Sequence, residues 1–300
     1  MQQPHARGAR PDRVLGVLLL TSGRDREYLA QVRRGIAAAV AAAEAAARPA
    51  RLARGESWLP PRGLVKNSNV PELFDRRVTV LHAVAVDDGQ PLGTLLHLAC
   101  HPEVLRRQNT LVSADFVGEL CDRWFAAGRG QAVFVNGALG AMVTPDGWPR
   151  DVEGMPRFAD GMIDACTTAL RAATPLDVRT LEVRRRDVYM PWDSFGLGLA
   201  RLTLAIPRES YGDCIRTGVG WLRLGPLEAV MVPGEIEPGL AERIRRAARR
   251  PDLLVFGLVD DEVGYLMSEK DARDRNYAYE RTMSPGPDAG ELVFEALVGR

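Results

Sequence analysis

The sequence LGTLLHLACHPEVLRRQNTLVSADFVGELCDRWFAAGRGQAVFVNGALGAMVTP, residues 92–145, alternates apolar runs with short polar junctions. The first run, 94–100, ends at His101, and the proline that follows interrupts regular backbone structure. A predicted amphipathic helix comes next, and a second apolar run, 132–135, leads into the glycine-containing loop 136–140. Polar residues at the ends of hydrophobic elements are typical of sites in α/β and α+β folds, because a rigid scaffold presents the loop side chains. We therefore expect a functional site where these junctions meet.

The sequence on either side predicts a mixed α/β (α+β) domain with layered mixed sheets and flanking helices. Alternating apolar residues over 78–86, a turn at 87–89 and the return run up to Cys100 predict a β-hairpin. A long alanine-rich helix is predicted over 25–47, with one apolar face packed against the core. Further helices are predicted over 113–127, 155–173 and 236–249, and further strands over 181–189, 218–232 and 253–258. Without an internal repeat or an obvious linker, residues 1–300 are expected to form a single domain.

Composition excludes several classes of function. The 39 basic and 39 acidic residues cancel, so no global field attracts the chain to nucleic acid or to an anionic membrane. The 4 cysteines are widely spaced and form no CxxC pair, which favours buried reduced thiols. The apolar run 14–20 is too short for a membrane span, and no signal-peptide cleavage site follows it, so the chain as written is predicted to be cytoplasmic.

Taken singly, the residues that could carry chemistry give weak signals. His82 lies on the apolar face of a predicted strand and is interpreted as a core histidine. His97 and His101 have the i, i+4 spacing of a zinc site, but the string HLACH lacks the glutamate of HExxH and lies in a predicted strand. We interpret His97 as a packing residue, whereas His101 is equally compatible with a structural and a functional role. Glu235 and Tyr265 each follow an apolar run, where a helix cap and a half-buried tyrosine are the simpler interpretations.

The combination of motifs is more specific than any one of them. Six blocks occur in the same order as in the catalytic domain of the neutral/alkaline (non-lysosomal) ceramidases, and this stretch of the chain, about residues 25–300, resembles that family, in particular its bacterial branch. The blocks are LLHLACHPE, NTLVSADFVGEL, AVFVNGALGAMVTPD, VPGE, GLVDDEVGY and YAYERTMSPGP. The resemblance implies a zinc-dependent amide hydrolase with a mixed α/β catalytic domain.

The same resemblance implies roles for five residues, matched by position in the motifs. The zinc ligands of the family correspond to His101, Glu235 and Tyr265. A hydroxyl residue of the family's glycine loop corresponds to Thr144, and a tyrosine beside the substrate amide corresponds to Tyr279. These residue types suit the chemistry, because zinc binds imidazole nitrogen and carboxylate or phenolate oxygen and activates water. A neighbouring hydroxyl can stabilise the oxyanion.

Several features depart from the family pattern. The family's catalytic domain begins before the point that corresponds to Met1, so the domain is expected to lack its first strands, and residues 1–24 match poorly. The remaining family ligand is a histidine, and the nearest one here, His5, stands one residue away from the ligand position. Asn67, Ser68 and Asn69 occupy the segment where an arginine is expected, and the glycine loop carries Ala141. We expect no counterpart of the immunoglobulin-like domain that follows in full-length ceramidases.

These observations predict hydrolysis of a linear amide, either a ceramide-like N-acyl sphingoid base or another N-acyl compound, by metal-activated water. The alternative is a catalytically impaired remnant or binding module that keeps the fold but has lost a zinc ligand, as the displaced His5 suggests. The predicted partner is a small-molecule or lipid amide. A domain without its first strands is also expected to expose a sheet edge through which the chain can self-associate.

Overall fold

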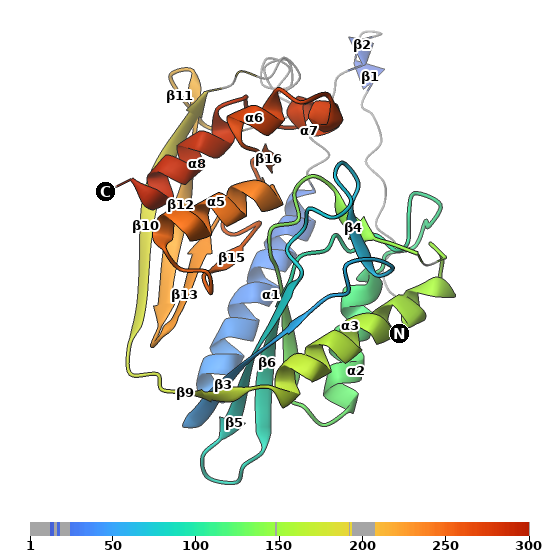
Figure 1. Ribbon diagram of the computed structural model, residues 1–300, viewed down its shortest axis with the longest axis vertical. Coiled ribbons are helices and arrows are strands. Elements are labelled where there is room, and N and C mark those ends of the chain that lie inside the picture. The colour runs from blue at the N-terminus through green and yellow to red at the C-terminus, as the bar shows by residue number, and fades with distance from the viewer. Residues whose placement is uncertain are drawn as a thin grey trace.

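The computed structural model describes residues 25–147, 149–191, 193 and 208–299, together with the short strands β1 (Arg13–Val14) and β2 (Val17–Leu18). Two five-stranded sheets pack face to face, and helices cover the outer face of each (Figure 1). The mixed α/β class predicted from the sequence is confirmed. The sandwich has separate cores under its two helical layers and an apolar layer between the sheets, which includes Leu81 and Val135 from one sheet and Leu254 and Phe256 from the other.

The first sheet contains the predicted hairpin at its centre. β5 (Arg77–Ala85) and β6 (Pro91–Leu98) are antiparallel, and β6 continues in parallel to β7 (Gln131–Asn136). The order is completed by two strands beyond β5, which are β3 (Ala50–Trp58) and β9 (Thr174–Leu176). Helices α2 (Asp115–Ala126) and α3 (Gly154–Arg171) pack on the outer face of this sheet. The sequence patterns did not predict β3, because its alternation is interrupted by arginine and glycine.

The second sheet has the order β10–β12–β13–β15. Its strands are β10 (Leu181–Pro191), β12 (Cys214–Leu224), β13 (Leu227–Met231) and β15 (Leu254–Phe256), with β11 (Ser210–Tyr211) paired to β12. The hairpin β12–β13 turns at Gly225, whose φ of 58° suits glycine. Helices α5 (Pro238–Ala248) and α8 (Ala289–Val298) pack on the outer face.

Two short strand pairs join loops that lie far apart in the sequence. β4 (Val65–Asn67) is antiparallel to β8 (Val143–Pro145), and β14 (Glu235–Ile236) is parallel to β16 (Tyr265–Leu266). The remaining elements are α6 (Glu269–Ala272), a 3-10 helix (Arg275–Tyr277) and α7 (Ala278–Thr282). Among the described helices, none is long and apolar enough to cross a membrane.

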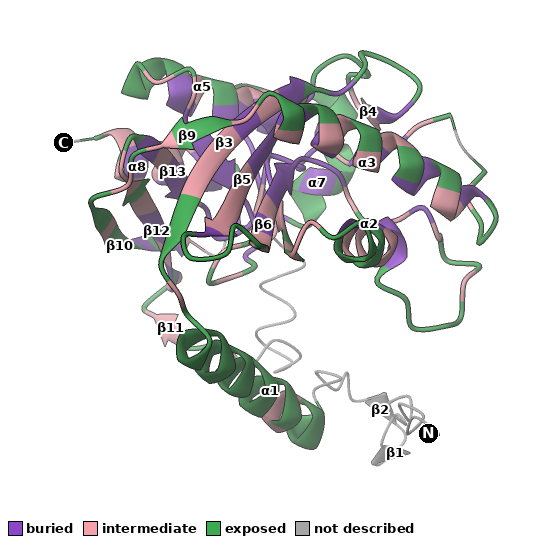
Figure 2. Cartoon of the chain, turned by 90° about the horizontal axis from the view of Figure 1, so that it is seen from below, coloured by how far each residue is buried: buried purple, intermediate pink, exposed green. Residues whose placement is uncertain are grey.

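The first helix corrects one expectation. α1 (Arg26–Ala45) forms where it was predicted, with Asp25 capping Glu27 N and Tyr28 N, but none of its residues is buried. Tyr28 and Ile36 are 63% and 60% exposed, and the helix lies beside the sandwich rather than within it (Figure 2). The prediction that one face packs on the core is therefore wrong. Alanine propensity and a good N-cap are enough to predict the helix, but periodicity alone does not say what its thin apolar stripe contacts.

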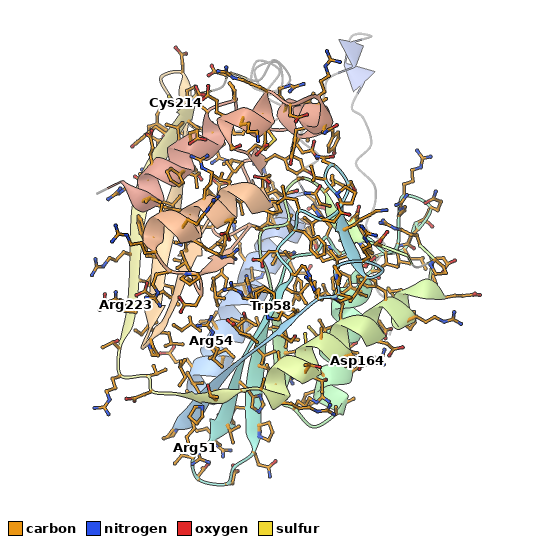
Figure 3. All side chains as sticks on the ribbon, in the orientation of Figure 1. Arg51, Arg54, Trp58, Asp164, Cys214 and Arg223 are labelled. Carbon is orange, nitrogen blue, oxygen red and sulfur yellow. The ribbon has the colours of Figure 1, made fainter. Side chains whose placement is uncertain are left out.

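Buried polar contacts connect the two sheets. His97 of β6 is 1% exposed, and its Nε2 donates to the carbonyl of Val255 in β15 at 2.9 Å. Arg245 of α5 pairs with Asp75, and the two side chains are 6% and 9% exposed. Arg54 of β3, labelled in Figure 3, donates to the carbonyl of Asp252 at 3.0 Å. His97 thus packs in the core as predicted, and it also helps to align the sheets.

The buried His97 generates a pH prediction. Burial lowers the pKa of His97 below its ordinary value of 6.5. As the pH falls through about 6.5, the unfolded state therefore binds a proton that the folded state does not, and stability decreases by up to about 1.4 kcal/mol per pH unit. We expect His97→Gln to reduce this loss of unfolding free energy between about pH 6.5 and 5, measured by urea denaturation. His82→Gln, at a partly buried histidine, is the matched control and should change the slope less. Equal slopes in wild type and His97→Gln would contradict the assignment.

Candidate active site

His101 follows the end of β6, and one carbonyl group fixes its position. The backbone N–H of His101 and its ring Nδ1 both donate to Val143 O, each at 2.8 Å. Because a carbonyl oxygen only accepts, Nδ1 carries a hydrogen, so Nε2 donates to a carboxylate when the ring is protonated. Nε2 lies 2.9 Å from Glu235 Oε2.

Glu235 is brought to His101 by the glycine loop. Gly140 N donates to Ile236 O at 2.9 Å. A Cβ on Gly140 would lie 2.6 Å from the carbonyl oxygen of Glu235, so only glycine allows the loop to approach β14 this closely. The motifs NGALG and VPGE, which lie about a hundred residues apart in the sequence, therefore pack against each other backbone to backbone.

Tyr265 is the register partner of Glu235 in the β14–β16 pair. Its side chain is buried, and its hydroxyl lies 3.1 Å from the sulfur of Met142. Burial, the charge of Glu235 and a hydrogen bond to Glu235 all raise the pKa of Tyr265 well above its ordinary value. The structure thus brings His101, Glu235 and Tyr265 together, although their role as ligands stays a prediction.

The charge of Glu235 shifts the pKa values of two neighbouring side chains, His101 and Glu262. Burial opposes protonation of His101, but the hydrogen bond and the negative charge of Glu235 outweigh it and raise the pKa of His101. Burial of its carboxyl group and the neighbouring charge of Glu235 raise the pKa of Glu262 to about 7, even though part of the residue faces solvent. The negative charge of Glu235 thus favours a proton on the imidazole of His101.

The metal-ligand set is smaller than the resemblance implies. Across the described residues, no group of three or more His, Cys, Asp or Glu side chains is arranged to hold a metal ion. The donors gathered here are one imidazole, one carboxylate and one phenol. His5, the predicted fourth ligand, lies outside the described residues.

The other predicted residues surround these three. Thr144 lies in β8 next to Val143, is 3% exposed, and donates its hydroxyl hydrogen to Glu103. Tyr279 in α7 is 59% exposed, and its ring centroid lies 6.1 Å from that of Tyr265. Ala141 has a φ of 62°, a conformation that favours glycine.

The polar segment 67–69 has a structural role. The Asn67 side chain accepts from Asn69 N and Val70 N at 2.8 and 3.0 Å, which forms the turn after β4. Asn69 Nδ2 donates to Glu280 Oε1 at 2.8 Å and so ties this turn to α7. The asparagines therefore stabilise one wall of the site.

Sequence reasoning missed three charged residues at this site. Glu262 stands three positions before Tyr265 in the string DDEVGY, and Glu103 stands two positions after His101, so proximity to a motif was the available signal. Arg150 donates to Thr144 Oγ1 at 2.7 Å. No pattern in the sequence marks Arg150, because the contact depends on how the loop before α3 folds back.

Comparison with known proteins bears on the fold. No protein-family model matches the chain, and no curated protein sequence matches it. Among solved structures, the chain is similar to the neutral ceramidase from Pseudomonas aeruginosa, with a TM-score of 0.69 and 17% identity over 88% of this chain and 54% of that one. It is also similar to a ceramidase complexed with C2, with a TM-score of 0.64 and 15% identity over 84% of this chain and 53% of that one.

The chain spans about half the length of these solved ceramidases. The two similarities cover 88% and 84% of this chain, respectively. The chain therefore has the ceramidase fold.

Proposed function

We propose that this protein hydrolyses a linear amide, either a ceramide-like N-acyl sphingoid base or another N-acyl compound, with a zinc ion as cofactor. The ceramidase fold supports this reaction class. The observation that carries the proposal is the contact of His101 Nε2 with Glu235 Oε2 at 2.9 Å, beside the phenol of Tyr265.

The three donors are of the chemical types that zinc binds. A zinc-binding histidine commonly donates its other ring N–H to a carbonyl or carboxylate, and His101 Nδ1 donates to Val143 O in this way. Its Nε2 and the Glu235 carboxylate then turn two lone-pair donors toward one point, which a cation between them would stabilise. His101, Glu235 and Tyr265 would hold the ion, and His5 is proposed as the fourth ligand. When bound, zinc would polarise the amide carbonyl and lower the pKa of water.

The residues around the three donors would bind substrate and transfer protons. Tyr279 is exposed beside Tyr265 and is proposed to contact the substrate amide. Glu262 has a pKa raised to about 7, so it retains a proton near neutral pH and could deliver it to the leaving amine. Thr144 is proposed to act in the same site through its hydroxyl group.

The alternative function is a remnant or binding module that keeps the fold without the activity. One observation favours it, which is the lack of a group of three His, Cys, Asp or Glu ligands among the described residues. The two functions differ in bound metal and in turnover, and both properties can be measured.

The first test is metal content. We expect the purified chain to bind zinc and to hydrolyse an N-acyl amide, and we expect His101→Ala to lose zinc affinity by at least about tenfold together with activity. His82→Gln is the matched control, because His82 contacts Thr94 far from Glu235. Zinc would be measured by elemental analysis and calorimetry. A folded wild-type protein with no zinc and no hydrolysis would instead support the remnant.

The second test addresses the proton donor. Glu262→Gln removes the titrating proton but keeps the size of the side chain, so kcat is expected to fall about tenfold to a hundredfold while bound zinc stays unchanged. Glu242→Gln, in an exposed salt bridge on α5, is the control. Steady-state kinetics with parallel zinc analysis would show the result. Unchanged kcat in Glu262→Gln would exclude this role.

A further inference from the structure

Three polar side chains next to His101 form a closed hydrogen-bonded cluster. The hydroxyl of Thr144 donates to Glu103 Oε1 and accepts a hydrogen bond from Arg150 Nη2 at 2.7 Å. The single hydroxyl hydrogen of Thr144 is therefore already used by a carboxylate acceptor. To act as a donor to a substrate oxygen, Thr144 would first have to give up its bond to Glu103.

Within the described ranges, most N–H groups of Arg150 have acceptors, and Nε is left over. Its Nη2 also donates to Pro145 O at 2.5 Å, and its Nη1 donates to Glu103 O at 3.3 Å. A guanidinium has five N–H groups, and these bonds use three of them. Nη1 also forms an ion pair with Glu103 Oε1 at 3.6 Å, so among the described residues Nε is the N–H group of Arg150 without an acceptor. The Arg150 side chain is only 16% exposed, so a cationic donor is held largely away from water.

The location of the cluster connects it to the candidate site. Glu103 follows His101 by two residues, and Thr144 directly follows Val143, whose carbonyl fixes the His101 ring. By contacting both segments, Arg150 holds together the two pieces of chain that position His101. Its remaining donor, Nε, is therefore fixed to the same scaffold as the imidazole.

We propose that Arg150 is the hydrogen-bond donor to the substrate carbonyl oxygen and to the carboxylate of the released acid, and that Thr144 and Glu103 are positioning residues for it. This inference rests on the proposed amide hydrolysis. A guanidinium stabilises a developing oxyanion better than a neutral hydroxyl does, because the hydrogen bond is charge-assisted. Thr144 then acts by directing the guanidinium rather than by contacting the substrate.

Kinetics of matched variants test the two roles. Arg150→Ala should lower kcat about a hundredfold, and Arg150→Lys should restore part of the loss. Added guanidinium ion should restore activity to Arg150→Ala by at least about tenfold, because it supplies the missing donor, whereas a purely structural loss would not respond. Thr144→Val should stay within about tenfold of wild type. Arg123→Ala, at an arginine paired with Asp160 on the surface, should show neither loss nor rescue.

Product binding gives a readout that does not depend on turnover. Laurate, titrated by calorimetry, should bind Thr144→Val less tightly than wild type but more tightly than Arg150→Ala, whose affinity should fall at least about tenfold. Equal laurate affinity in wild type and Arg150→Ala, or no binding to wild type, would overturn the role of Arg150. The role would also be overturned if Thr144→Val lost as much activity as Arg150→Ala and guanidinium did not rescue Arg150→Ala. Failure of wild type to hydrolyse any amide would instead refute the proposed function, while laurate binding would still decide the role of Arg150.

Discussion

The carbonyl group of Val143 is the constraint on which the candidate site depends. It accepts from both the backbone and the ring of His101, so it determines the ring's direction and the nitrogen that faces Glu235. Glu235 can contact that nitrogen only because Gly140 allows the loop before Val143 to approach β14. A change that moves Val143 therefore affects the imidazole directly, whereas a change elsewhere in the sandwich acts on the site only through this loop.

The site is held by very short strands. The β4–β8 and β14–β16 pairs contain three and two residue pairs, respectively. Pairs of this length are not stable alone in water, so the large sheets on either side must supply their stability. Loops between rigid layers can carry charged side chains without disturbing the core, and this explains how Glu235 and Glu262 lie near one imidazole.

The sheets themselves are joined by polar as well as apolar contacts. The buried pair of Arg245 and Asp75 and the bond from His97 to Val255 lie in or next to the layer between the sheets. Removing one partner of a buried pair leaves an uncompensated charge, which typically costs about 3–5 kcal/mol. These contacts therefore restrict how the sheets can slide over each other, and the alignment of the sheets decides where the loops of the site meet. In the same way, the contacts of Glu103 and Thr144 with Arg150 restrict the position of its guanidinium group.

The order of motifs in the sequence was enough to predict the mixed α/β class, the β5–β6 hairpin, most helices and the residues His101, Glu235 and Tyr265. These features depend on local patterns or on the family resemblance. The sequence could not predict that α1 lies outside the cores of the described sandwich. Periodicity identifies an apolar helix face, but it does not identify the surface that this face contacts. It also could not reveal Arg150 or Glu262, because their importance comes from distances between segments far apart in the chain. The contact between His101 and Glu235 was decided only by tertiary structure, through the close backbone approach at Gly140 and the shared carbonyl of Val143.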